Sequence, residues 1–269
     1  VFLPETVNRW KEQRIDRVIR EEFIKPMLPN KSADLMDFAL YFPIRVIYSL
    51  IGFPEDKPEK IKQYAVWALA ILAGPQVDPA KAEAAKKAAG RSLDDHEVTT
   101  FVRSLLPAAG ETTTRTFGTL MVQLLENPDV LERVRADRGL VNKAIDESIR
   151  YEPVATFKVR QAANATEIRG VQIPKGAMVS CIVSSANRDE EAFVNADKFD
   201  IDRKPRPSFG FGFGPHMCIG QFVAKTEINC ALNAILDLMP NLRLDPSKPA
   251  PKITGAQLRG PHELHVLWD

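Results

Sequence analysis

The chain has 269 residues, of which 45% are hydrophobic and 26% are charged, a composition typical of a globular protein with one large core or two smaller ones. Its 36 Lys and Arg residues are matched by 35 Asp and Glu residues without a long basic cluster, which argues against nucleic-acid binding. The most apolar stretch, residues 65–73, has about half of the roughly 18 residues that a membrane-spanning helix needs, so the sequence favours a soluble protein.

Helical spacing of apolar residues dominates the first third of the chain. Ile15, Val18, Ile19 and Phe23 fall on one face of a helix and predict an amphipathic segment over residues 5–25. Three more helices are predicted at residues 35–51, 59–72 and 80–89.

A long helix is predicted next. Ser92 can cap it with Asp95 as the capping-box partner, and the helical pattern continues to Leu125 before Pro128 stops it. At ~1.5 Å per residue such a helix is on the order of 50 Å long, enough to cross a domain. Pro107 lies inside it and removes one backbone hydrogen bond, which predicts a kink near residues 108–112.

The second half of the chain mixes helices with short strands. Helices are predicted at residues 128–135, 140–151 and 219–239, and strand-like runs at residues 157–162, 167–173 and 178–183. Residues 187–207 form a long irregular connection, which is typical of functional segments, and the tail over residues 242–268 reads as short strands and turns. The predicted fold class is mainly α with small β-sheets, in a single domain over residues 1–269.

One cysteine stands out because it lies on a glycine-rich loop immediately before a helix. The segment over residues 211–220 places Cys218 where the unpaired backbone N–H groups of a helix N-terminus favour a thiolate, and a thiolate is a metal ligand. Gly212 and Gly220 would let the backbone approach a flat cofactor, and Phe211 could pack beneath it. A zinc site built on His216 and Cys218 is the alternative, but no second ligand pair at metal spacing follows.

The other two cysteines carry no such signal. Cys181, Cys218 and Cys230 form an odd and widely spaced set without a CxxC motif, which fits reduced thiols in the cytoplasm better than a disulfide framework. Cys181 and Cys230 are most simply explained as buried small apolar residues.

The cysteine loop resembles the haem-binding loop of the cytochrome P450 family. The family pattern has Phe and Gly, then His or Arg two residues before the Cys, then Gly two residues after it, and the chain matches each of these positions. The resemblance implies that Cys218 is the axial ligand of the iron of haem b. It also implies that His216, Phe211, Gly212 and Gly220 help to bind that haem.

A second stretch resembles the oxygen-binding part of the family's long helix. Glu111 and Thr112 fall on the acid and the threonine of that pattern, although Ala109 occupies the usual glycine position and Gly110 the variable one. Taken alone, the stretch is better explained by a helix interior in which Thr bonds back to the i−4 carbonyl. The resemblance implies that Thr112 hydrogen-bonds dioxygen and that Glu111 helps to bring protons from water.

Two further matches concern arginines. Glu147 and Arg150 form an i, i+3 pair that on its own is usually a solvated surface feature. They resemble the family's Glu-x-x-Arg motif, which implies that they are tied to Arg203 as structural support for the haem pocket. Arg160 matches the strand arginine that the family uses, together with His216, as a partner of the haem propionates.

The resemblance to soluble bacterial members implies a haem-thiolate monooxygenase that hydroxylates an apolar substrate. It also implies electrons from NAD(P)H through a ferredoxin and a ferredoxin reductase. A peroxide-using haem-thiolate enzyme and a non-enzymatic haem-binding remnant are the alternatives. Seven apolar residues, each also explained as plain core, fall in segments that line the family's substrate cavity: Ala68, Leu69, Leu72, Val154, Phe157, Ile253 and Ala256.

The chain is shorter than the family pattern. Members have on the order of 400 residues, and this sequence starts where a helix well inside the domain is expected. Roughly forty expected residues are also skipped between Ala89 and Arg91. The sequence is therefore expected to be the C-terminal two-thirds of the family fold, without its N-terminal part and an internal segment.

Overall fold

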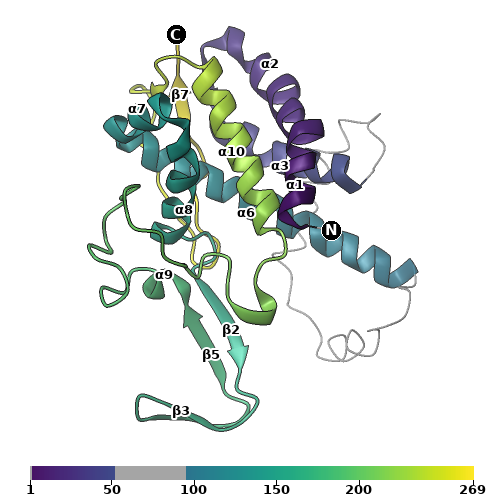
Figure 1. Cartoon of the computed structure of the whole chain (residues 1–269), viewed down its shortest axis with the longest axis vertical. Helices are drawn as coiled ribbons and strands as arrows, with labels where there is room; N and C mark the ends of the chain where they lie inside the picture. Colours follow the sequence, from purple (N-terminus) through teal and green to yellow (C-terminus); the bar gives the residue numbers. More distant parts are fainter. Residues whose placement is uncertain (1, 52–94) are drawn as a thin grey trace.

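The computed structural model describes residues 2–51 and 95–269, and it is mainly helical with three small antiparallel sheets (Figure 1). The predicted fold class is confirmed. The helices are α1 (Pro4–Trp10), α2 (Lys25–Met27), α3 (Leu35–Ile51), α6 (Asp95–Glu126), α7 (Pro128–Ala136), α8 (Val141–Tyr151), α9 (Val183–Ala186) and α10 (Gln221–Leu238). The strands are β1 (Ser32–Asp34), β2 (Phe157–Gln161), β3 (Thr166–Ile168), β4 (Val171–Ile173), β5 (Met178–Ile182), β6 (Arg243–Leu244) and β7 (His265–Leu267).

The N-terminal amphipathic segment is helical, as predicted, but it is not one regular α-helix. Between α1 and α2 the chain forms wider π-helical turns over Lys11–Ile15 and Val18–Ile24. Ile15 and Ile19 are fully buried, so the apolar face that the sequence shows is the face that packs on the core. Each π-helical turn contains more residues than an α-helical turn, so it changes the direction in which the following side chains point. This keeps the apolar residues of the segment on the side that faces the core.

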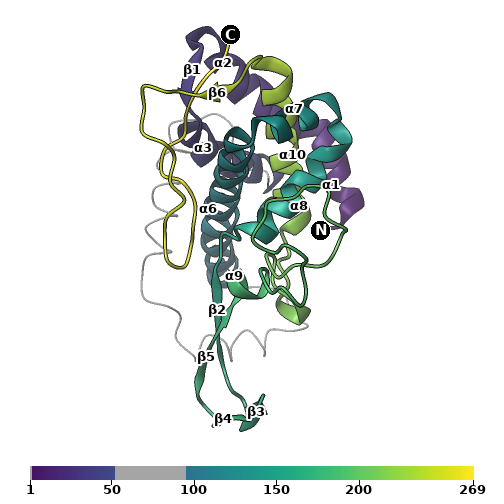
Figure 2. The ribbon, with the colours of Figure 1, turned by 90° about the vertical axis from the view of Figure 1, so that its left-hand side faces the viewer.

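The long helix α6 forms the centre of the molecule together with α3 (Figures 1 and 2). Phe38 and Phe42 of α3 stack with ring centroids 4.7 Å apart, and Phe117 of α6 meets Phe38 edge-on at 5.5 Å. Aromatic pairs of this geometry add to the burial of apolar area. Pro107 lies inside α6 without dividing it into two helices, and the proposed cap Ser92 lies outside the described residues.

Most of the other predicted elements are found close to their expected bounds. Helices α3, α7, α8 and α10 coincide with four predicted helices, and the run over residues 167–173 is the hairpin β3–β4 with Gly170 at its turn. The helices predicted at residues 59–72 and 80–89 lie outside the described residues. Strand β1, which the sequence analysis missed, pairs with β7 near the C-terminus through Ala33 and Val266. A three-residue strand carries too little pattern to be recognised locally.

Helix α10 follows the cysteine loop and is buried along most of its length. Its residues Ile228, Leu232 and Ile235 are completely buried in the main core. In Figure 1 the helix lies across the face of the molecule, between α8 and α1. The loop that precedes it is thus anchored to the main core.

A buried carboxyl group on α10 predicts a pH dependence of stability. Glu227 is buried, its Oε1 has no hydrogen-bond partner, and burial raises its pKa well above the ordinary value. Between the ordinary pKa of about 4.5 and the raised pKa, the Glu227 carboxyl therefore stays protonated in the native state and loses its proton in the unfolded chain. The free energy of unfolding should fall as the pH rises from about 4.5 towards the raised pKa, by at most about 1.4 kcal/mol per pH unit from this group.

The Glu227→Gln variant should lose this part of the pH dependence and be more stable than the wild type at neutral pH. Urea unfolding at a series of pH values between 4 and 8 measures the difference. Identical pH profiles for the two proteins would show that Glu227 has an ordinary pKa in the fold.

In the part of the chain that the structure describes, no helix is both long and apolar enough to cross a membrane.

Candidate cofactor site at the cysteine loop

The cysteine loop has the backbone geometry that its glycines suggest. Gly212 and Gly214 have φ angles of +79° and +72°, in the left-handed region that residues with a Cβ rarely adopt. The loop closes through a hydrogen bond of 2.9 Å from the Cys218 N–H to the Phe211 carbonyl. Helix α10 begins three residues after the cysteine, at Gln221. Cys218 therefore lies directly ahead of a helix N-terminus, as predicted.

The surroundings of Cys218 are open and apolar. The thiol-bearing residue is exposed, and so are Phe213 and Ile219 on the same loop, at 78% and 72%. Exposed apolar side chains that gather in one place often mark a binding site. The ribbon formed by β2 and β5 lies beside the loop in both views of the molecule (Figures 1 and 2).

The structure places the other predicted cofactor residues around the same loop. His216 is exposed at the end of a single 3-10 turn, Gly214–His216. Phe211 is half-buried against the core, with the Lys225 ammonium 5.7 Å from its ring centroid. A Cβ added at Gly220 would lie 3.9 Å from the Cys218 Sγ, an ordinary van der Waals distance. Arg160 is exposed on β2.

The predicted oxygen-handling residues lie on α6. The Thr112 hydroxyl donates a hydrogen bond of 2.6 Å to the Ala108 carbonyl, which is the i−4 contact expected of a threonine inside a helix. Glu111 accepts from Arg115 Nε at 2.9 Å and is mostly buried. The pair of Glu111 and Arg115 was not predicted, although the i, i+4 spacing of an acid and an arginine could have indicated it.

The shift of the glycine from position 109 to position 110 has a packing reason. A Cβ added at Gly110 would lie 2.7 Å from Ile44 Cγ1 of α3, closer than real side chains approach. A larger residue at position 110 would therefore force Ile44 to shift where α6 and α3 touch, while Ala109 packs at the edge of a small second core.

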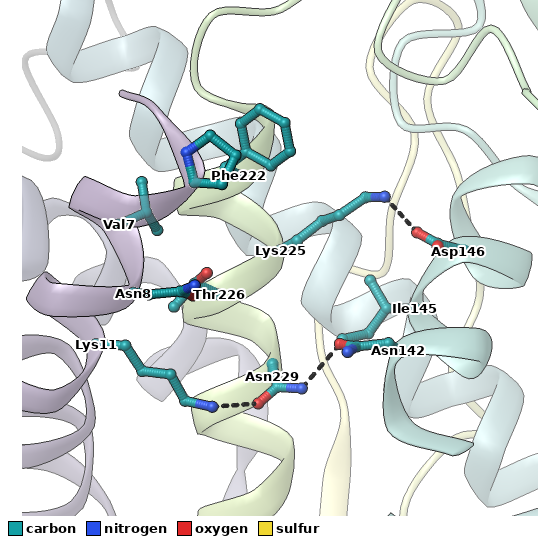
Figure 3. Close-up of a pocket in the computed structure, with 11 residues that line it drawn as sticks. Val7, Asn8, Lys11, Asn142, Ile145, Asp146, Phe222, Lys225, Thr226 and Asn229 are labelled. Atoms are coloured by element: carbon teal, nitrogen blue, oxygen red, sulfur yellow. Dashed lines mark hydrogen bonds and ion pairs between the residues drawn. The ribbon is translucent and has the colours of Figure 1, made fainter. Parts of the chain in front are cut away.

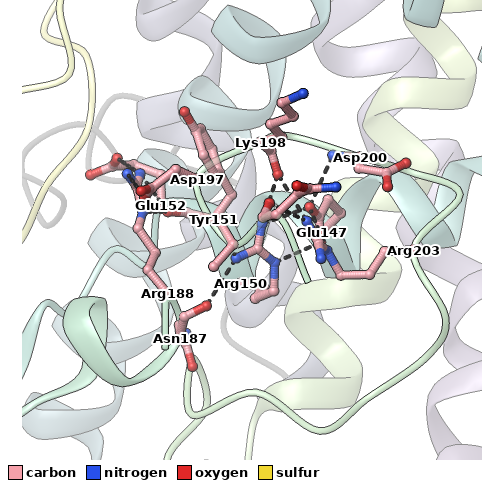
Figure 4. A network of polar contacts seen from close by, with 12 residues as sticks. Glu147, Arg150, Tyr151, Glu152, Asn187, Arg188, Asp197, Lys198, Asp200 and Arg203 are labelled. Atoms are coloured by element: carbon pink, nitrogen blue, oxygen red, sulfur yellow. Dashed lines mark hydrogen bonds and ion pairs between the residues drawn. The ribbon is translucent and has the colours of Figure 1, made fainter. Parts of the chain in front are cut away.

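Glu147, Arg150 and Arg203 form a buried ionic network (Figure 4). Two hydrogen bonds of 2.8 and 2.7 Å join Arg150 to the Glu147 carboxylate, and Arg203 Nε reaches both carboxylate oxygens at 3.2 Å. Glu147 and Arg150 expose only 5% and 3% of their surface. The spacing of Glu147 and Arg150 in the sequence predicts that both lie on one helix. Their burial could not be predicted, because it depends on the irregular segment over residues 187–207 that covers α8.

The same arginine fixes that irregular segment by its backbone. Arg150 donates to the carbonyls of Asn187, Ala196 and Lys198 at 2.8 to 2.9 Å. The Asn187 side chain accepts from the Phe209 N–H at 2.8 Å, two residues before the cysteine loop. The network therefore connects α8 to the start of that loop.

Of the apolar residues expected near a substrate, Ala68, Leu69 and Leu72 lie outside the described residues. Val154 is buried and Phe157 is half-buried at the start of β2. Ile253 packs on the main core, whereas Ala256 is exposed.

A separate pocket of about 290 Å³ lies between α1, α8 and α10 (Figure 3). Lys225 and Asp146 form an ion pair of 2.6 Å in it, and Asn229 donates to Asn142 at 2.9 Å. None of the predicted site residues lines this pocket.

The zinc alternative gains no further ligand from the structure. Within residues 2–51 and 95–269, no group of three or more His, Cys, Asp or Glu side chains is placed to hold a metal ion.

Comparison with known proteins places the chain beside one family. The family model described as "Cytochrome P450" matches residues 76–254. Cytochrome P450-SU2 of Streptomyces griseolus is 35% identical over 261 residues, which cover 88% of this chain and 65% of that protein. Vitamin D3 dihydroxylase of the same species is 32% identical, and the alignment covers 98% of this chain and 72% of that protein.

Solved structures agree with the sequence comparison. The post-tailoring hydroxylase HmtN, involved in himastatin biosynthesis, is 26% identical with a TM-score of 0.85 and matches all of this chain but 77% of its own. The cytochrome P450 enzyme CYP109B1 from Bacillus subtilis is 29% identical with a TM-score of 0.84, over 99% of this chain and 80% of its own. The chain thus spans about two thirds to four fifths of these relatives.

Proposed function

Because the chain belongs to the cytochrome P450 family, whose members depend on a haem with a thiolate ligand, we propose that it acts as a haem-thiolate monooxygenase. The reaction would insert one oxygen atom from O2 into an apolar organic substrate. The observation that carries this proposal is the open thiol of Cys218 on a glycine-bearing loop directly ahead of α10.

The residues around Cys218 fit a haem. The thiol is exposed rather than packed against protein, and apolar side chains of the same loop stand open beside it, as Phe213 and Ile219 do. The cation Arg160 lies on the adjoining ribbon, where a propionate could pair with it. Cys218 would ligate the iron, with Arg160 and His216 as partners of the carboxylates.

When bound, a thiolate-ligated haem supplies the electron-rich iron that activates dioxygen after two electrons arrive. The chain's own residues would manage the proton supply. Because the Thr112 hydroxyl donates its hydrogen to the Ala108 carbonyl, its lone pairs would accept from a proton-carrying water molecule, whereas a hydrogen bond to dioxygen would require the hydroxyl to turn away from Ala108. Glu111 would release Arg115 before carrying a proton, since the two side chains are paired.

The Thr112→Ala variant tests this role. Removing the Oγ1 acceptor should leave consumption of NAD(P)H in place but lower the yield of oxygenated product per reductant, because protons then reach oxygen without control. The matched control is Thr116→Ala, since Thr116 makes the same bond one turn later, to the Thr112 carbonyl at 2.7 Å. Equal coupling in the wild type and Thr112→Ala would refute the role of Thr112.

The proposed partners follow from the bacterial relatives. A ferredoxin and its NAD(P)H-dependent reductase would deliver the electrons, and the substrate would be a small, largely apolar molecule. Cytochrome P450-SU2 and Vitamin D3 dihydroxylase of Streptomyces griseolus support a bacterial-type enzyme.

A carbon monoxide difference spectrum tests the haem-thiolate proposal directly. The chain is reconstituted with haem, reduced and exposed to carbon monoxide, and the position of the Soret band is recorded. A band at the position typical of thiolate ligation is expected. Absence of any haem uptake, or a Soret position typical of a neutral ligand, would overturn the proposal.

A further inference from the structure

The ribbon of β2 and β5 presents two cations on one face. Successive residues of a strand point to opposite faces, so Lys158 and Arg160 share a face of β2. Their cross-strand partners on β5 are Cys181 and Val179, neither of which is an acid. This face thus carries positive charge without a carboxylate on the opposing strand.

Lys158 is the more enclosed of the two cations. It is half-buried, whereas Val159, Arg160 and Gln161 after it are exposed. Burial and the nearby Arg160 lower the pKa of its ammonium group, and the electrostatic interaction with Cys218 opposes this. The β2–β5 ribbon lies beside the cysteine loop in Figures 1 and 2, and the Cys218 sulfur is near enough to act on the charge of Lys158.

Neither cation has an acidic partner in the structure. Across residues 2–51 and 95–269, no ion pair or hydrogen bond engages the Lys158 ammonium, and Arg160 only donates to the neighbouring Val159 carbonyl at 2.9 Å. A partly desolvated ammonium group is costly unless an anion compensates it. The half-buried Lys158 and the exposed Arg160, on a ribbon beside an open thiol, therefore form a site for an anionic ligand.

We infer that Lys158 is a haem-positioning residue that binds one of the two haem carboxylates beside Arg160. This inference rests on the proposed function, since it takes the ligand of Cys218 to be haem. Haem carries two carboxylates, and Lys158 would bind one of them in addition to Arg160 and His216, the partners proposed above. The two groups would fix the rotation of the ring about the Cys218 ligand.

The rival explanation is that Lys158 acts only on the Cys218 thiolate, as a neighbouring positive charge. The two explanations differ in what they require of the ligand. If Lys158 acts only through the sulfur, its effect on porphyrin affinity does not depend on the porphyrin carboxylates. If Lys158 binds a carboxylate, that contact is lost when the carboxylates are esterified.

The test compares two ligands on two proteins. Binding of haem and of haem dimethyl ester to the cofactor-free chain is titrated by Soret absorbance, for the wild type and for Lys158→Met. The substitution should weaken haem binding about tenfold, the size of one charge-assisted hydrogen bond, and leave binding of the ester unchanged. Lys158→Arg should restore most of the haem affinity.

The matched control is Lys175→Met, which removes an exposed lysine from the turn between β4 and β5 and should alter neither affinity. Equal weakening for both ligands would overturn the inference in favour of an effect on the thiolate or the fold, and so would unchanged haem binding. If the wild type takes up neither porphyrin, the haem proposal itself fails, and the assignment of Lys158 fails with it.

Discussion

Replacing Cys218 with alanine is expected to abolish the thiolate-type Soret band of the reduced, carbon monoxide-bound protein. The Sγ atom is the proposed iron ligand, and no substitute thiol is available in the described residues. Cys230 is buried on α10, where burial raises the pKa of its thiol to about 12, so it stays protonated at neutral pH. Cys181 is exposed, contrary to the prediction that it is buried, but it lies within strand β5 and not ahead of a helix N-terminus.

The matched control is Cys181→Ala, because Cys181 is the other exposed cysteine of the described chain. It should keep the full thiolate spectrum. The measurement is the carbon monoxide difference spectrum of both variants at equal haem content. A thiolate-type band that survives in Cys218→Ala would refute Cys218 as the ligand. Loss of the band in Cys181→Ala would indicate that Cys181 on β5 is the iron ligand instead.

Replacing Glu147 with leucine should have the largest effect on stability. The substitution leaves the guanidinium of Arg150 without its carboxylate in a site where only 3% of that residue is exposed. Breaking a buried ion pair by removing one partner typically costs about 3–5 kcal/mol. Arg203 loses the same partner, so the segment over residues 187–207 should loosen as well.

The control is Asp202→Leu, which breaks the pair between Asp202 and Arg133 at the surface, where Asp202 is 57% exposed. Exposed pairs contribute at most about 1 kcal/mol, so this variant should unfold close to the wild type. Urea unfolding followed by circular dichroism gives both free energies. A loss for Glu147→Leu no greater than for Asp202→Leu would show that the network does not hold the fold together.

These two predictions depend on the sequence to different degrees. Cys218 can be singled out from its neighbours alone, since the glycines and the following helix are adjacent in the chain. The pair of Glu147 and Arg150 is also visible as an i, i+3 spacing. Its energetic importance is not, because the same spacing on a solvated helix contributes only a few tenths of a kcal/mol.

The sequence by itself determined the helices that repeat an apolar pattern every three to four residues, as in α3, α8 and α10, and the loop around Cys218. These features depend on contacts between residues close in the chain, which a local pattern records. The pairing of β1 with β7, more than 200 residues apart, depends on packing across the whole chain.

Only the tertiary structure decided which polar groups are buried and what they face. It showed that Arg150 donates hydrogen bonds to the carbonyls of Asn187 and Lys198, and that Lys158 is half-buried on β2. Burial and charge environment are set by elements far apart in sequence, since each segment that covers a side chain removes water from it. Cys218, Arg160 and His216 could therefore be predicted from the chain, whereas the half-buried position of Lys158 near them became visible only in the fold.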